Sequence, residues 1–273
     1  MKPDKHRSSR RSLTVLTCTI ALILVVIAVA AAAASAATPE YRQAGLPISH
    51  KISYTWSGGQ LNWDRVFPIG KESEGEEIWE CKSSIGEGEL VNSTEGKLKL
   101  TFKECKWKNP LGEVLSCTSE GQGAGTIVTE PLKSHLYYAH DGLNGKGPLV
   151  AVVDFSPESG EKVVKKFSCG TVGPHEWHGS LLGAYEKVNE IGITTAHLVI
   201  KRQPVEEPQH KFTANQEPEI YETLTSECNA STATSDYLKQ NTAFSEFERI
   251  GLQNSPDTIT FKEGLEIHAP CIP

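Results

Sequence analysis

The stretch Lys97-Leu98-Lys99-Leu100-Thr101-Phe102-Lys103 alternates between polar and apolar side chains without a break. Successive side chains of a β-strand point to opposite faces, so Leu98, Leu100 and Phe102 share one face of such a strand. The lysines and Thr101 occupy the other face. This pattern predicts an antiparallel strand with one buried face and one solvated face.

Other segments of the same character recur along the chain, and Gly- or Pro-bearing turn signals separate them at short intervals. Residues 149–155 are almost entirely apolar and predict a strand covered on both faces, and residues 196–200 resemble them. Residues 258–261 and 265–269 predict a closing hairpin around Lys262-Glu263-Gly264. Many short strands between turns predict an all-β fold, an antiparallel β-sandwich or barrel-like domain.

Helical signal is weak and confined to residues 237–252, where apolar residues form an imperfect stripe. Residues 202–218 are polar and interrupted by prolines, which predicts a linker or a long loop. We therefore expect a flexible lead-in at 38–50, a β-rich core domain at 51–201 and a C-terminal section at 219–273. Because the last hairpin is strand-like, the alternative is that this section completes the same sheet.

The first 37 residues have the form of an export signal. Five basic residues precede an uncharged apolar run from Leu13 to Ala37, and small residues at its end suit cleavage after Ala36 or Ala37. The run of 25 residues also exceeds the ~20 that a spanning helix needs, so an uncleaved hydrophobic helix that anchors the chain is the alternative. Both interpretations predict a protein that is secreted or held in the cell envelope. Membrane contact is expected only through residues 13–37, and only if the leader is not cleaved.

The chain after this leader is strongly acidic. Residues 1–37 contain five of the 27 basic residues and one of the 34 acidic residues, which leaves 22 and 33 and a net charge of −11. Such a surface is repelled by nucleic acid and by anionic polymers, so we expect no nucleic-acid partner.

Six cysteines remain beyond the leader, an even number that predicts three disulfides in an exported protein. Cys228 and Cys271 are alone in the last hundred residues, which favours a bond between them. Cys105 and Cys117 flank the turn signal at 109–112 almost symmetrically, which favours a bond across a hairpin and leaves Cys81 with Cys169. The alternative pairing, Cys81 with Cys105 and Cys117 with Cys169, stays open.

No residue pattern predicts a catalytic, metal or cofactor site. In His175-Glu176-Trp177-His178 the histidines are three apart, so on a strand they face opposite sides and do not share a metal, and Trp177 is the expected buried anchor. Gly121–Thr126 lacks the spacing of a dinucleotide loop and predicts a turn, as does His140-Asp141-Gly142.

Trp56 and Trp63 lie near a glycine-flanked segment. Exposed on a β-rich protein, they would form a stacking platform for a sugar ring or a partner surface, so they are candidate ligand-stacking residues. The favoured interpretation is that they fill the core.

A longer pattern runs from Cys81 to about Val199. It includes Leu100-Thr101-Phe102-Lys103-Glu104-Cys105, Gly125-Thr126-Ile127-Val128-Thr129-Glu130-Pro131-Leu132 and Phe167-Ser168-Cys169. This pattern resembles a group of exported, cysteine-bearing hypothetical proteins of soil actinobacteria of the Solirubrobacter type. The resemblance implies export, an all-β module and disulfides, and it implies no catalytic residue.

These observations favour a non-catalytic exported β protein that binds at or outside the cell envelope, with an extracellular glycan or another protein as its partner. Two alternatives remain. One is an extracellular hydrolase with an unrecognised site, and the other is a membrane-tethered envelope protein with its β domain outside.

Overall fold

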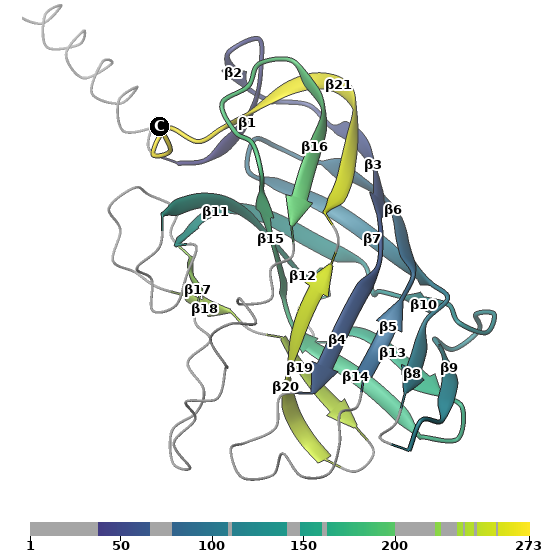
Figure 1. The fold of residues 1–273 in the computed structure, drawn as a ribbon. Coiled ribbons are helices and arrows are strands. Elements are labelled where there is room, and N and C mark those ends of the chain that lie inside the picture. The colour runs from purple at the N-terminus through teal and green to yellow at the C-terminus, as the bar shows by residue number, and fades with distance from the viewer. Residues whose placement is uncertain are drawn as a thin grey trace, which may run out of the picture.

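A computed structural model describes residues 38–65, 78–108, 111–140, 148–159, 163–199, 222–224, 234–236, 238–242, 245–254 and 256–273. Every regular element in these ranges is a β-strand, which confirms the all-β prediction (Figure 1). No helix with the length and apolar character of a membrane span occurs in these ranges. The leader and the 202–218 segment lie outside the described residues, and the predictions made for them stay predictions.

Eight antiparallel strands form a closed ring, which we call the upper barrel after its position in Figure 1. The ring closes because β16 pairs with β15 on one side and with β21 on the other. In ring order its strands are β16 (Ile193–Val199), β15 (Leu181–Tyr185), β12 (Leu149–Pro157), β11 (Leu132–His140), β7 (Glu95–Lys103), β6 (Ser83–Leu90), β3 (Ile52–Gly58) and β21 (Asp257–His268). Three short strands attach to it: β1 (Glu40–Gln43), β2 (Leu46–Pro47) and β10 (Ile127–Val128).

A second closed ring, the lower barrel, lies end to end with the first (Figure 1). Its strands in ring order are β13 (Val163–Cys169), β14 (Pro174–Gly179), β19 (Leu238–Thr242), β20 (Ser245–Asn254), β4 (Leu61–Arg65), β5 (Ile78–Cys81), β8 (Lys106–Lys108) and β9 (Val114–Thr118). A separate two-stranded sheet joins β17 (Glu222–Leu224) to β18 (Thr234–Asp236).

The chain alternates between the two barrels. At three places only one or two residues separate a strand of one barrel from a strand of the other. Gly59-Gln60 separates β3 from β4, Lys82 separates β5 from β6, and Glu104-Cys105 separates β7 from β8. Glu104 has a φ of 52°, in the left-handed region that turns a strand sharply. Short breaks of this kind redirect a strand and let one set of hairpins build both rings.

The strand predictions at the centre of the chain are confirmed. In β7 the side chains of Leu98, Leu100 and Phe102 are buried and the intervening lysines are not. In β12 both faces are largely covered, since Ala151, Val152 and Val153 are consecutive and all buried. Closing a sheet into a ring pairs every ring strand on both sides, which among the described strands leaves unpaired edges only on the short attached strands and on the β17–β18 sheet.

Three predictions about the chain ends are wrong. Residues 237–252, the helix candidate, contain β19 and most of β20, because pairing with β14 and β4 outweighs a weak helical stripe. Residues 257–268 form one bent strand, β21, and not a hairpin around Lys262-Glu263-Gly264. Residues 38–50, expected as a lead-in, form β1 and β2, and Tyr41 is buried in the core.

The C-terminal section also returns to the main fold, as the alternative interpretation held. One part of β21 pairs with β3, and its end pairs with β1. Residues 257–268 therefore complete the same sheet as the core domain, and β19 and β20 complete the lower barrel.

The favoured disulfide pairing is wrong, and the alternative is the one observed. Cys81 is bonded to Cys105 and Cys117 to Cys169, and all four cysteines are buried. Cys271 is also disulfide-bonded. Because Cys228 lies outside the described residues, its bond to Cys271 stays a prediction.

Candidate functional site

The lower barrel encloses a lysine surrounded by aromatic rings. Lys165, on β13, is fully buried, and its Nζ lies 3.1 Å from the ring centroid of Trp177, 4.5 Å from that of Phe102 and 5.3 Å from that of Phe167. Burial lowers the pKa of Lys165 well below its ordinary value. The ring faces act in the opposite direction, because their quadrupoles attract a cation.

His175 lies beside this group and is also sealed inside. Its ring stacks on Phe167 with centroids 5.2 Å apart, and it meets Trp79 edge-on at 5.9 Å. Only 3% of His175 is exposed. The Lys165 amine and the His175 imidazole are closed off from solvent in this way, so neither is accessible to a dissolved substrate.

The histidine motif has the orientation that its spacing predicts. His175 points into the barrel, whereas His178 lies on the other face and contacts the Glu176 carboxylate at 3.1 Å. Trp177 is the buried anchor. Burial opposes ionisation of Glu176, but hydrogen bonds with Lys166 and His178 outweigh it and lower the pKa of that carboxyl. In the described part of the chain, no three His, Cys, Asp or Glu side chains gather as a metal site would need.

The upper barrel encloses three tyrosines. The hydroxyls of Tyr41 and Tyr185 share a hydrogen bond of 2.9 Å, and Tyr54 donates to the Lys97 carbonyl oxygen at 3.1 Å. Burial raises the pKa of Tyr41 to about 12, and it raises the pKa values of Tyr54 and Tyr185 as well. The phenols therefore stay neutral and serve as hydrogen-bonding groups of the core.

Glycines make room for large side chains inside the upper barrel. A Cβ added at Gly88 would lie 2.3 Å from Cζ of Tyr54, and one added at Gly183 would lie 1.8 Å from Cδ2 of Leu198. Both distances are far below van der Waals contact. An eight-stranded barrel is just wide enough for side chains to fill, and at these positions it is filled up to the backbone.

Trp56 belongs to the core, so its proposed stacking role is wrong. Its side chain is 2% exposed, packs edge-on against Phe155 and donates from Nε1 to the Ser84 hydroxyl at 3.1 Å. Trp56 and Tyr54 are two residues apart on β3, so both side chains lie on its inward face. The side chain of Trp63 lies outside the described residues, although its backbone pairs with Trp79 across β4 and β5.

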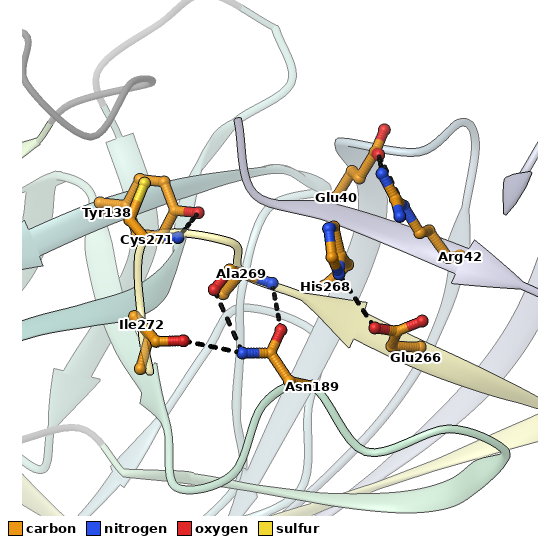
Figure 2. A network of polar contacts seen from close by, with 9 residues as sticks. All are labelled: Glu40, Arg42, Tyr138, Asn189, Glu266, His268, Ala269, Cys271 and Ile272. Atoms are coloured by element: carbon orange, nitrogen blue, oxygen red, sulfur yellow. Dashed lines mark hydrogen bonds and ion pairs between the residues drawn. The ribbon is translucent and has the colours of Figure 1, made fainter. Parts of the chain in front are cut away.

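A polar clamp holds the C-terminal tail across one end of the upper barrel (Figure 2). Asn189 accepts a hydrogen bond from the Ala269 amide at 2.8 Å and donates to the carbonyl oxygens of Ala269 and Ile272 at 3.2 and 3.0 Å. Tyr138 accepts from the Cys271 amide at 3.3 Å. The tail covers buried Tyr138 and Ala151, so the clamp closes this end of the barrel.

Beside the clamp, a row of charged side chains crosses from β1 to β21 (Figure 2). Glu40 lies opposite His268 and Arg42 opposite Glu266. Arg42 contacts Glu40 at 2.6 Å, and His268 contacts Glu266 at 2.9 Å. Each of these side chains therefore has its polar partner on its own strand.

The outer wall of the upper barrel carries a shallow polar hollow of about 320 Å³. Its rim is built by Glu87 and Glu89 on β6, facing Lys99 and Lys97 on β7, and by Glu158 after β12. Lys97 is paired with Glu158. The remaining lining residues are Ser53, Gly88, Leu98, Pro131 and Leu132. We take this hollow, with donors and acceptors facing solvent, as the candidate binding site.

Sequence reasoning missed Lys165. A lysine followed by Lys166 suggests a solvated strand, yet period-two alternation places Lys165 on the same face as Phe167 and Cys169. This alternation was the sequence signal that could have placed Lys165 inside the barrel. The backbone of His140 ends β11, but its side chain and residues 141–147 lie outside the described residues.

Comparison of the chain with protein-family models, with curated proteins and with solved structures finds no match. The resemblance to exported actinobacterial proteins therefore stays a prediction.

Proposed function

We propose that this chain is a non-catalytic exported protein that binds a polypeptide partner of the cell envelope through the hollow on its upper barrel. The observation that carries this proposal is that the polar side chains described inside the two barrels are buried, and that the upper barrel is filled up to its backbone. Lys165, His175 and the buried tyrosines are enclosed by other side chains, and glycines are needed even to admit Tyr54. Recognition is therefore assigned to the outer surface.

The chemistry of the hollow favours a polypeptide over a glycan. Glu87, Glu89, Lys97 and Lys99 offer alternating charges in two facing rows, which complement a segment of mixed charge. None of its described lining residues is aromatic, so a sugar ring would find no face to stack on. Burial of Trp56 removes one half of the stacking platform that would have favoured a glycan.

The two disulfides among the described residues are compatible with an extracytoplasmic location, because such bonds persist in oxidising compartments. The mass of the protein recovered from culture medium and from the envelope, with and without reductant, tests export and cleavage together. Recovery of reduced protein from the cytoplasm alone would overturn the export part of the proposal.

In-cell photocrosslinking tests the binding part. A photoreactive phenylalanine replaces Ser53, which lines the hollow, and in a matched strain it replaces Ser116, an exposed serine on the lower barrel. We expect a discrete protein adduct from position 53 only. The adduct should disappear when Glu87→Lys and Glu89→Lys reverse the charge of one row.

Two outcomes contradict this proposal. The first is an identical adduct pattern from both positions, or an adduct that survives the charge reversal. The second is stoichiometric labelling of the purified chain by a serine-directed fluorophosphonate, which would favour the hydrolase alternative.

A further inference from the structure

Two exposed aliphatic side chains project from neighbouring segments at one end of the upper barrel. Leu46, on β2, is 70% exposed, and Ile191, in the loop between β15 and β16, is 79% exposed. Figure 1 shows the β1–β2 hairpin beside the loop that precedes β16 at this end. We call Leu46 and Ile191 the apolar tips.

Contacts along the bend of β21 bring the two segments together. Gln43 donates to the Glu263 carboxylate at 2.9 Å, and a Cβ added to Gly264 would lie 3.1 Å from the Gly192 carbonyl oxygen. The bend at residues 263–264 thus contacts the base of the first tip on one side and the base of the second tip on the other. Both apolar tips are therefore anchored by the fold to the same bend of β21.

The leader joins the described chain close, in sequence, to the first apolar tip. Residues 13–37 are uncharged and apolar and join the described chain at Thr38, eight residues before Leu46. Eight residues span at most about 30 Å, so a leader held in a bilayer keeps the first apolar tip within that distance of it. The tether makes any contact between the tips and the same bilayer intramolecular.

We propose that, in the chain whose leader stays uncleaved, this end of the upper barrel faces the lipid bilayer that residues 13–37 enter, with Leu46 and Ile191 inserted at the interface. Burial of two aliphatic side chains is too little to hold a free protein at a bilayer but enough to orient a tethered one. The acidic surface, with its net charge of −11 beyond the leader, gives no electrostatic attraction to anionic lipid. The contact is therefore apolar and insensitive to salt.

This inference goes beyond the proposed function and is tested on the full chain in vesicles. Leu46→Trp and Ile191→Trp each place a tryptophan at a tip, and Leu111→Trp places one on the β8–β9 hairpin at the far end, where Leu111 is 93% exposed. Each variant is reconstituted into phosphatidylcholine–phosphatidylglycerol vesicles with or without bromine on the acyl chains. Subtraction of the wild-type signal isolates the new tryptophan.

We expect brominated lipid to quench the new fluorescence at positions 46 and 191 at least twofold more than at position 111, at low and at high salt. Equal quenching at all three positions would overturn the proposal. Amide exchange of the unmodified chain gives an independent readout, since vesicles should protect residues 44–47 and 190–192 relative to detergent and leave residues 111–114 unchanged. Lack of that protection would also overturn it, whereas the crosslink from position 53 would be unaffected.

Discussion

Cys105 and Cys117 lie directly opposite each other across the β8–β9 hairpin, yet they are not bonded to each other. The Cys117 amide donates to the Cys105 carbonyl oxygen at 2.9 Å, whereas the Cys105 amide donates to the Gly125 carbonyl oxygen at 2.9 Å. One backbone hydrogen bond therefore joins the two residues, which continue the β8–β9 register on its hydrogen-bonded side. In an antiparallel sheet the Cα atoms of such a pair are about 5.5 Å apart, and those of the alternate, non-hydrogen-bonded pair about 4.5 Å.

The same geometry explains the bonds that do form. A residue that is hydrogen-bonded to one neighbouring strand takes the closer, non-hydrogen-bonded position toward the other. Cys105 therefore meets Cys81 on the β5 side, and Cys117 meets Cys169 on β13, with Cα atoms 4.0 Å apart in both pairs. Four cysteines form one row across the barrel wall, and the hydrogen-bond register selects their partners.

Removal of either disulfide should destabilise the chain by about 3–4 kcal/mol, as expected from the loop-closure entropy of the unfolded state. We would measure this by denaturant unfolding of Cys81→Ala/Cys105→Ala and of Cys117→Ala/Cys169→Ala. The double variant Cys105→Ala/Cys117→Ala breaks both bonds and should be less stable than either. Non-reducing peptide maps that instead contain a Cys105–Cys117 peptide would contradict the register argument.

Methionine in place of Lys165 should change how stability depends on pH. Burial lowers the pKa of Lys165 in the folded state. At pH values between the folded-state pKa of Lys165 and its unfolded-state pKa of ~10.4, the unfolded chain binds one more proton than the folded chain. Rising pH in this range therefore stabilises the fold, by at most about 1.4 kcal/mol per pH unit. Lys165→Met should lose this rise at pH values below the unfolded-state pKa. Lys166→Met, at an exposed site on the same strand, is the control, and pH profiles of Lys165→Met that parallel the wild type would refute the prediction.

Alanine in place of Gly88 should disrupt the upper barrel. Its Cβ would overlap the Tyr54 ring, and overpacking of this kind costs typically ~1–3 kcal/mol. Gly123→Ala is a matched control, because no atom lies within 4 Å of the added Cβ. Thermal unfolding of the two variants compares them directly. Equal unfolding midpoints for the two variants would show that the barrel interior can accommodate an added methyl group. That result would also weaken the proposed function, which assumes a filled interior.

Replacement of Asn189 should release the C-terminal tail. Asn189→Gly and Asn189→Ala both remove the side-chain hydrogen bonds to Ala269 and Ile272, but only glycine adopts the φ of 61° without cost. We expect faster amide exchange at Ala269 and Ile272 in both variants and about 1 kcal/mol of additional destabilisation in Asn189→Ala. Exchange at Leu100, in the middle of β7, serves as the internal reference. Unchanged exchange at Ala269 would mean that other contacts hold the tail.

Local pattern was sufficient for the strands with a strict alternation. Leu98, Leu100 and Phe102 predicted β7 because the period of a strand is a local property of the backbone. The same alternation correctly placed His175 and His178 on opposite faces. Where apolar residues were sparse, as at 237–252, pairing with distant strands decided the structure, and the weak helical signal was misleading.

The sequence by itself determined that the chain is all-β, that its cysteines suit an oxidising compartment, and that an apolar leader precedes an acidic domain. These are properties of composition and of short-range period, which need no knowledge of partners in space. Only the tertiary structure decided that the strands close into two barrels, that Cys105 bonds to Cys81 and not to Cys117, and that Trp56 and Lys165 are enclosed. Each of these depends on pairing between strands far apart in the chain, and the register of such pairing is set by the packing of the whole ring.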